Sequence, residues 1–138
     1  MIISEMLAEF YGCADALEHE AALTDAARAA VLAEGATILG TADVRYVPHG
    51  LTIGLFLAES HIVLTTWPEY RLLLVNVMLC NPAMDGRRVL DQLQKAVCPN
   101  GVRVFHEVKR AIGAGPEPWP AAVSRRHSPM SVTRPEPP

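Results

Sequence analysis

One stretch of the chain places polar residues inside an otherwise apolar strand pattern. Residues 51–57 and 62–66 are rich in apolar and β-branched side chains and predict two strands. Glu-Ser-His lies between them at residues 59–61, and the rigid turn Trp-Pro-Glu-Tyr follows at residues 67–70. Buried polar groups cost free energy unless they are hydrogen bonded. The stretch therefore predicts either a hairpin with a polar tip or a chemical site.

The patterns around this stretch predict an α+β fold. Alanine-rich residues 18–34 favour a helix that ends at Gly35, and residues 85–97 carry the apolar stripe of a second helix. Further strands are predicted at residues 6–11, 37–47, 71–80 and 102–108. We expect a two-layer sandwich, in which an antiparallel sheet is covered on one face by two helices. The run at residues 71–80 is apolar apart from its start and Asn76, which favours a central strand or one at a subunit interface.

Length and charge limit the possible classes of protein. The chain has 138 residues, enough for one domain with its own core, which we expect over residues 1–112. Seven of the eleven prolines fall in residues 113–138, which predicts a disordered tail. A net charge of -3 provides no electrostatic basis for binding nucleic acid. No apolar run is long enough to span a bilayer, so we expect no membrane segment.

The three cysteines, Cys13, Cys80 and Cys98, are odd in number and irregularly spaced. They form no CxxC pair and have no histidine at zinc-finger spacing, so no metal site is predicted. We expect reduced thiols in a cytoplasmic protein.

Four segments, taken in order and spacing, resemble the prokaryotic S-adenosylmethionine decarboxylases, whose chains cleave themselves. The segments AESH and TWPEY within residues 58–70 resemble the self-cleaving segment. LAEFYGC at residues 7–13 resembles the first strand of the family, and GATI at residues 35–38 the start of its second. VNVMLC at residues 75–80 resembles the strand with the catalytic cysteine. The resemblance covers about residues 6–110.

The resemblance implies cleavage between Glu59 and Ser60, which converts the serine into a covalent pyruvoyl group. That group would form a Schiff base with the amine of S-adenosylmethionine and accept the electrons released with carbon dioxide, so no soluble cofactor is needed. The product would be the aminopropyl donor for polyamine synthesis. The family also implies a homodimer with its active site near the interface.

The resemblance also assigns roles to single residues. Cys80 matches the cysteine that returns a proton to the α-carbon of the substrate. Glu69 matches the glutamate that binds the ribose hydroxyls, and Tyr46 matches an aromatic residue that stacks on the adenine. Phe10 is a candidate for the opposing face of the adenine. Cys13 and Cys98 are expected to be structural.

Two positions of the processing machinery depart from the family pattern. Thr65 replaces a histidine that assists the elimination step, and Thr52 replaces a serine that stabilises the processing intermediate. His61 and His49 are near Ser60 in sequence, and a neutral imidazole is a suitable base near pH 7. Either histidine is therefore a candidate for the missing proton transfer.

Two alternative functions follow from further departures. Asn76 replaces a usual acidic residue and Arg71 replaces a usual glycine, which suggests a pyruvoyl-dependent decarboxylase of ornithine or arginine. The retained Glu69 and Tyr46 argue against that alternative, because those substrates have no nucleoside. Thr65 suggests a non-processing homologue that acts as a binding or regulatory subunit.

Overall fold

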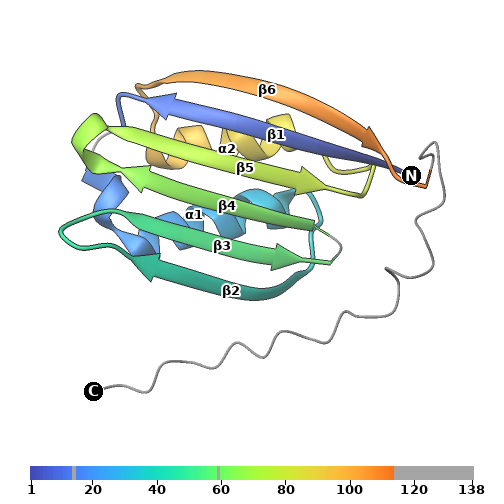
Figure 1. The fold of residues 1–138 in the computed structure, drawn as a ribbon, viewed down its shortest axis with the longest axis horizontal. Coiled ribbons are helices and arrows are strands. Elements are labelled where there is room, and N and C mark those ends of the chain that lie inside the picture. Colours follow the sequence, from blue (N-terminus) through green and yellow to red (C-terminus); the bar gives the residue numbers. More distant parts are fainter. Residues whose placement is uncertain (14, 59, 114–138) are drawn as a thin grey trace, which may run out of the picture.

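The computed structural model describes residues 1–13, 15–58 and 60–113, and over these residues it contains one antiparallel sheet with two α-helices on one face (Figure 1). The strands, in chain order, are β1 (Ile2–Tyr11), β2 (Ile38–Arg45), β3 (Leu51–Leu57), β4 (Ser60–Trp67), β5 (Leu72–Leu79) and β6 (Val102–Ala111). The helices are α1 (Glu20–Ala33), α2 (Gly86–Val97) and the short 3-10 helices η1 (Asp15–Glu18) and η2 (Pro68–Tyr70). The strand order is β2-β3-β4-β5-β1-β6, which confirms the predicted two-layer α+β sandwich.

Some element boundaries differ from those expected. β1 begins at Ile2 instead of residue 6, because its first residues pair with β6 in the register Ile2↔Ala111. The predicted first helix is divided, since η1 precedes α1 and His19 separates them. Gly35, at φ +82°, follows α1 in the left-handed conformation expected of a glycine there.

The core lies between the helices and one face of the sheet. Strand alternation brings every second residue of β3, β4 and β5 to this face, where most are fully buried. The matching helix residues are Leu23, Ala27, Ala30 and Val31 of α1 and Val89, Leu90, Leu93 and Val97 of α2. β5 is a central strand, as expected.

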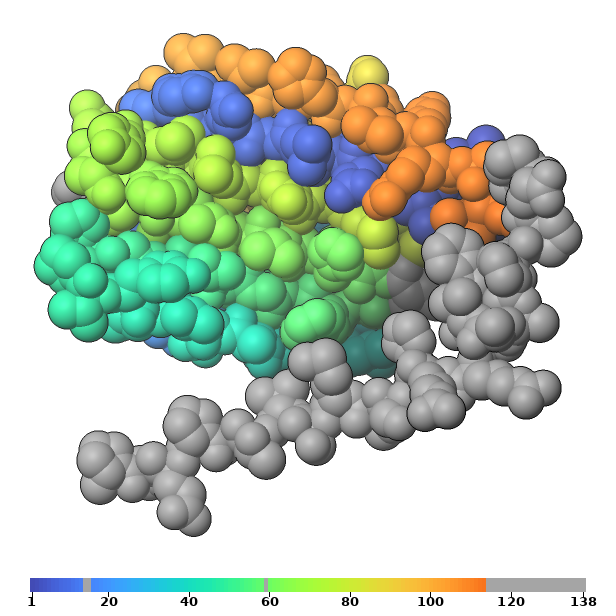
Figure 2. Space-filling model, in the orientation of Figure 1, coloured from blue at the N-terminus to red at the C-terminus, as the bar shows by residue number. Residues whose placement is uncertain are grey.

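Within the part of the chain that the structure describes, no helix covers the other face of the sheet, which Figure 2 shows from β2 to β6. We call it the open face. Its middle consists of cross-strand neighbours on β3, β4, β5 and β1, namely Thr52, Val63, Thr65, Leu74, Asn76 and Leu7. Several apolar side chains of this face are exposed, including Leu7 and Phe56.

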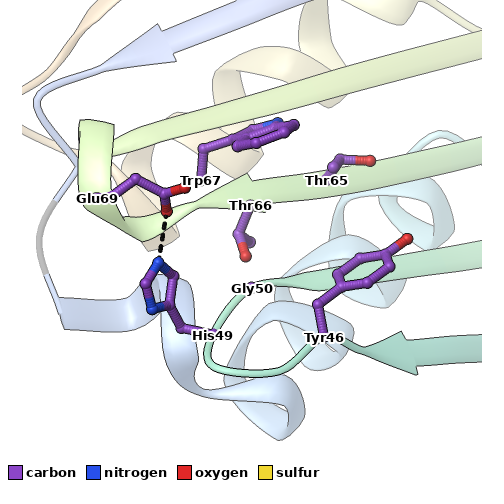
Figure 3. Close-up of a pocket in the computed structure, with 7 residues that line it drawn as sticks. All are labelled: Tyr46, His49, Gly50, Thr65, Thr66, Trp67 and Glu69. Carbon is purple, nitrogen blue, oxygen red and sulfur yellow. Dashed lines mark ion pairs between the residues drawn. The ribbon is translucent and has the colours of Figure 1, made fainter.

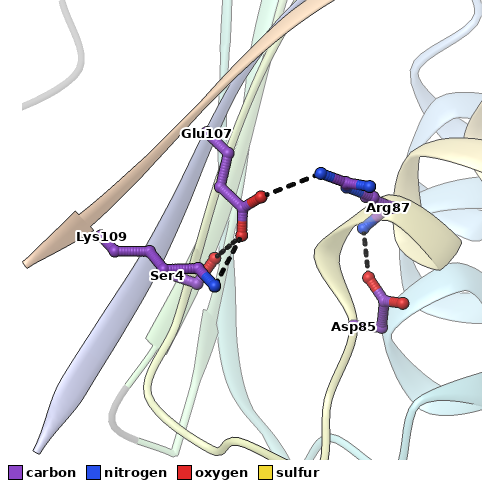
Figure 4. Close-up of polar contacts among 5 residues, drawn as sticks. All are labelled: Ser4, Asp85, Arg87, Glu107 and Lys109. Atoms are coloured by element: carbon purple, nitrogen blue, oxygen red, sulfur yellow. Dashed lines mark hydrogen bonds and ion pairs between the residues drawn. The ribbon is translucent and has the colours of Figure 1, made fainter.

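Polar contacts fix the start of α2 against the sheet (Figure 4). The Asp85 carboxylate caps the helix by accepting the Arg87 backbone N–H at 2.9 Å. The Arg87 guanidinium pairs with Glu107 of β6 at 3.2 Å, and the Ser4 hydroxyl of β1 donates to the other Glu107 oxygen at 3.1 Å. Lys109 lies 3.9 Å from Glu107. These contacts join α2 to the β1–β6 edge of the sheet.

A disulfide joins Cys13, just after β1, to Cys98, the residue after α2. Both residues are buried and their Cα atoms are 4.7 Å apart, although 85 positions separate them in the sequence. The expectation of reduced thiols is therefore wrong for this pair. The spacing of the cysteines in the sequence did not reveal that the end of β1 and the end of α2 lie close together.

Two expectations concern other parts of the chain. The proline-rich tail falls, from residue 114 onward, outside the described residues, so its disorder stays a prediction. Among the described helices, none has the length and apolar character needed to cross a membrane.

The disulfide leads to a stability prediction. Cys98→Ser should lower the free energy of unfolding by about 2–4 kcal/mol, because the cross-link restricts the unfolded chain. Guanidinium denaturation with and without a reductant measures this loss. The reductant should destabilise the unchanged protein by a similar amount and leave the variant nearly unaffected. Three reactive thiols instead of one in the denatured, unreduced protein would contradict the cross-link.

Candidate active site

Ser60 stands at the tip of the β3–β4 hairpin. Leu57 pairs with Ser60, so the connection has only two residues, of which Glu59 lies outside the described residues. Ser60 is 8% exposed, and its Oγ accepts the Cys80 backbone N–H at 3.2 Å. Cys80 directly follows β5 and is partly exposed. The structure therefore brings together the two residues predicted to carry the central chemistry.

A small cavity of about 190 Å³ lies beside Ser60 on the helix side of the sheet. Leu57, Asn81 and Met84 contribute to its lining. The Asn81 carboxamide oxygen accepts the Ala83 backbone N–H at 2.9 Å and closes the turn after Cys80. This turn fixes the backbone next to the serine.

A second cavity, of about 310 Å³, lies at the opposite end of β4 (Figure 3). Its walls come from the β2–β3 connection, the end of β4 and η2, and its lining residues are Tyr46, His49, Gly50, Thr65, Thr66, Trp67 and Glu69. The volume is at the lower end of the range for small-molecule sites, and a few polar groups stand among apolar surface. We call it the β4-end cavity.

Three hydroxyl groups form a chain at the wall of the β4-end cavity. The Tyr46 hydroxyl lies 3.0 Å from Thr52 Oγ1, which is 3.3 Å from Thr65 Oγ1. Thr52 and Thr65 are direct cross-strand partners on the open face. The chain fixes the Tyr46 side chain beside the cavity.

The carboxylate of Glu69 faces His49 across the same cavity. His49 Nε2 lies 3.0 Å from Glu69 Oε2, and each side chain is more than one third exposed. Figure 3 shows this pair at one end of the cavity and the Tyr46 hydroxyl at the other. From the sequence, Glu69 was predicted to bind the ribose and His49 was a candidate base, but a contact between them was not predicted.

Ser60 and Cys80 lie too far from the residues of the β4-end cavity for the two groups to act on one another within one chain. Ser60 and Thr65 are five residues apart on β4, roughly 16 Å at the rise of an extended strand. An odd separation also places them on opposite faces, so Ser60 faces the helices and Thr65 the open face. His61 likewise alternates to the open face, and His49 lies in the distant cavity.

The prediction for Phe10 is wrong. Its side chain is completely buried on the helix side of β1, so it cannot stack on a ligand in the β4-end cavity. Trp67, which we did not predict, lines that cavity instead and is 42% exposed. The sequence did contain a signal for Trp67. Residues two positions apart in a strand point to the same face, so Trp67 could have been expected on the same face as Thr65.

Arg71 has a structural explanation. It adopts φ +52°, in the left-handed region, where it ends η2. Its side-chain Nε–H donates to the Cys13 carbonyl oxygen at 3.0 Å, and the Cys13 N–H donates to the Arg71 carbonyl oxygen at 2.9 Å. The guanidinium thus anchors the turn that carries Glu69.

Glu9 and Tyr11 add charge and polarity to the open face. Glu9 pairs with Leu74, which in turn pairs with Thr65. The Tyr11 hydroxyl donates to the Glu9 carboxylate, and this hydrogen bond raises the pKa of Tyr11 above its ordinary value. Tyr11 therefore stays protonated as a donor at neutral pH.

Fold and site together define a class of protein: a two-layer sandwich with a serine at a hairpin tip, a neighbouring cysteine, and a polar cavity at the far end of the same strand. The model of the family described as S-adenosylmethionine decarboxylase matches residues 4–111. The chain belongs to this family, which confirms the resemblance found in its sequence.

Relatives and solved structures agree with this assignment. An S-adenosylmethionine decarboxylase proenzyme of Pyrobaculum arsenaticum is 36% identical over 98 residues, covering 70% of this chain and 78% of the relative. One of Thermotoga petrophila is 30% identical over 122 residues, covering 86% and 94%. The crystal structure of the adenosylmethionine decarboxylase from Aquifex aeolicus has a TM-score of 0.66 at 25% identity, covering 79% of this chain and 88% of that chain.

The hydroxyl chain leads to a prediction on stability. Thr52→Val removes the hydroxyl that joins Tyr46 to Thr65 and should lower the free energy of unfolding by about 1 kcal/mol, the net value of a typical hydrogen bond. Thr52→Ser keeps the hydroxyl and should remain within about 0.5 kcal/mol of the unchanged protein. Urea denaturation compares the two variants. Equal stabilities would mean that the chain of hydroxyls contributes nothing.

Proposed function

We propose that this chain is a pyruvoyl-dependent decarboxylase of S-adenosylmethionine, which cleaves itself between Glu59 and Ser60 and acts as a cytoplasmic homodimer. Its membership of the family supports the reaction class. The hydrogen bond from the Cys80 backbone N–H to Ser60 Oγ is the single observation that carries the proposal, because it joins the candidate nucleophile of cleavage to the residue proposed as proton donor of turnover.

The reacting groups of the proposed cleavage are the Ser60 hydroxyl and the peptide bond before it. Ser60 Oγ would add to the carbonyl carbon of Glu59, and the C–N bond would break to leave an ester and a free amine. Elimination would then break the Cβ–O bond, releasing the Glu59 carboxylate and leaving a dehydroalanine. Water would replace its nitrogen, which leaves as ammonia, to give the pyruvoyl group. The Cys80 N–H holds Oγ at the start of this sequence.

The pyruvoyl group would supply the electron sink for decarboxylation. The residues present fit such a group, since Ser60 begins a strand at a two-residue turn and has a cavity beside it. Cys80 is partly exposed and its backbone contacts Ser60, which supports the proposal that its thiol returns a proton to the α-carbon.

The β4-end cavity suits the nucleoside part of the substrate. Tyr46 and Trp67 offer aromatic faces to the adenine and to the sulfonium charge. Glu69 offers carboxylate oxygens to two neighbouring ribose hydroxyls.

A homodimer would complete the site. The Ser60 group and the β4-end cavity lie at opposite ends of β4, so a single chain cannot present both to one substrate. The open face carries exposed apolar side chains, including Leu7, Phe56 and Val104. Two open faces packed about a two-fold axis would bring the cavity of each chain to the Ser60 end of its partner.

The structure supplies another explanation for one of the departures that motivated the alternatives. Arg71 suggested another amino acid as substrate, but its guanidinium is used to anchor the η2 turn. Thr65 suggested a chain that cannot process. Position 65 does not approach Ser60 of the same chain, but as part of the β4-end cavity it would approach Ser60 of the other chain in the proposed dimer, so the mass measurement decides this alternative. No observation in the described residues favours either alternative over the decarboxylase.

Mass measurement and carbon dioxide release test the proposed function. After reduction of the Cys13–Cys98 disulfide, the purified protein should consist of fragments of 59 and 79 residues, while Ser60→Ala stays whole and the control Ser4→Ala is cleaved normally. Carbon dioxide release should saturate with S-adenosylmethionine and be absent with ornithine and arginine. A chain that never cleaves would support the binding homologue, and release from ornithine or arginine would support the second alternative.

Mixing two variants tests the shared site. Ser60→Ala and Glu69→Leu should each be nearly inactive at low substrate concentration when pure. Co-expressed in equal amounts they should recover about a quarter of the unchanged rate, because half of the dimers are mixed and one of the two sites in each is intact. Activity no higher than the sum of the pure variants would show that each chain carries a complete site.

A further inference from the structure

We infer that His49 is a positioning residue for the ribose of the substrate, because it holds the Glu69 carboxylate in place in the β4-end cavity. The inference rests on the proposed function, since it takes a nucleoside as the ligand of that cavity. His49 Nε2 and Glu69 Oε2 are 3.0 Å apart, a hydrogen-bond distance. Among the described residues, His49 is the partner of Glu69 in its one ion pair.

Glu69 needs such a partner because its own surroundings restrain it weakly. It lies in η2, a 3-10 helix of three residues, and its side chain is 38% exposed. A glutamate side chain loses up to about 2 kcal/mol of rotamer entropy when it is fixed. A donor that fixes the carboxylate before the ligand arrives removes part of that cost from binding.

The backbone that carries His49 is itself held against β4. The Tyr46 N–H donates to the Gly50 carbonyl oxygen at 2.9 Å and closes the turn. Gly50 has φ +104°, and a Cβ there would lie 3.3 Å from the Thr66 carbonyl oxygen, so the turn requires glycine. The next residue, Leu51, donates its N–H to Thr66 Oγ1 at 2.9 Å.

The geometry leaves part of the carboxylate for the ligand. The imidazole contacts Oε2, and each carboxylate oxygen accepts more than one hydrogen bond. Figure 3 shows the imidazole of His49 next to the Glu69 carboxylate on one side of the view, with Tyr46 and Thr65 on the other side. The ring can therefore orient the carboxylate without filling the space between Glu69 and Tyr46.

Calorimetric binding of 5′-deoxy-5′-methylthioadenosine to the purified, processed protein tests the inference. This probe has the nucleoside but no amino acid, so its binding does not depend on decarboxylation. His49→Leu should weaken binding about three- to tenfold, the effect of one lost hydrogen bond. His49→Gln, which keeps an N–H donor, should stay within about twofold. The control His19→Leu changes an exposed histidine at the start of α1 and should bind normally.

The 2′,3′-dideoxy form of the probe separates positioning from a general structural effect. Without the ribose hydroxyls, the unchanged protein and His49→Leu should bind it equally. In turnover, His49→Leu should raise KM for S-adenosylmethionine while kcat changes little.

Failure of the inference is distinguishable from failure of the proposed function. Decarboxylation of S-adenosylmethionine without any effect of His49→Leu would overturn the role of His49 and leave the function intact. Hydroxyl-dependent nucleoside binding that needs His49, in a protein that releases no carbon dioxide, would support the role and overturn the function. No binding of the probe to the unchanged protein, or an equal loss with the dideoxy form, would overturn the inference.

Discussion

The pairing of β4 with its two neighbours is the interaction on which the site depends. β3 sets one register, in which Leu57 meets Ser60 and Thr52 meets Thr65, while β5 ends where Cys80 can reach the serine. Because side chains alternate along a strand, this register also decides which residues face the helices and which face the open side. A slip by one residue would exchange the two sets and bury the threonines in place of the apolar core.

The same strand therefore separates the chemistry into two parts. Ser60, the proposed nucleophile, lies at one end of β4 on the helix side, whereas the polar cavity lies at the other end and opens beside the uncovered face. Within a single chain neither part is a complete active site for one small substrate. The exposed apolar residues of the open face supply a physical reason for the proposed second copy to cover it, and the two-fold symmetry of such a homodimer would join opposite ends.

The sequence predicted the architecture because its signals are local. Apolar alternation located the strands and the apolar stripes located the helices, and the segments around Ser60 and Cys80 identified the family. Long-range contacts were not predictable in the same way. The Cys13–Cys98 disulfide depends on the convergence of two distant ends, and the side of β1 on which Phe10 lies depends on the phase of alternation relative to the helices.

The departures from the family pattern are related to one another by the structure. Thr52 and Thr65 replace two different family residues, yet they are cross-strand partners whose hydroxyls lie 3.3 Å apart. Facing hydroxyls on neighbouring strands stabilise each other, so the second change is compatible with the first. Tyr46 completes the same chain of hydroxyls at the cavity wall. In this chain the two threonines therefore belong to one hydrogen-bonded wall, and a change at either position would alter the contacts of the other.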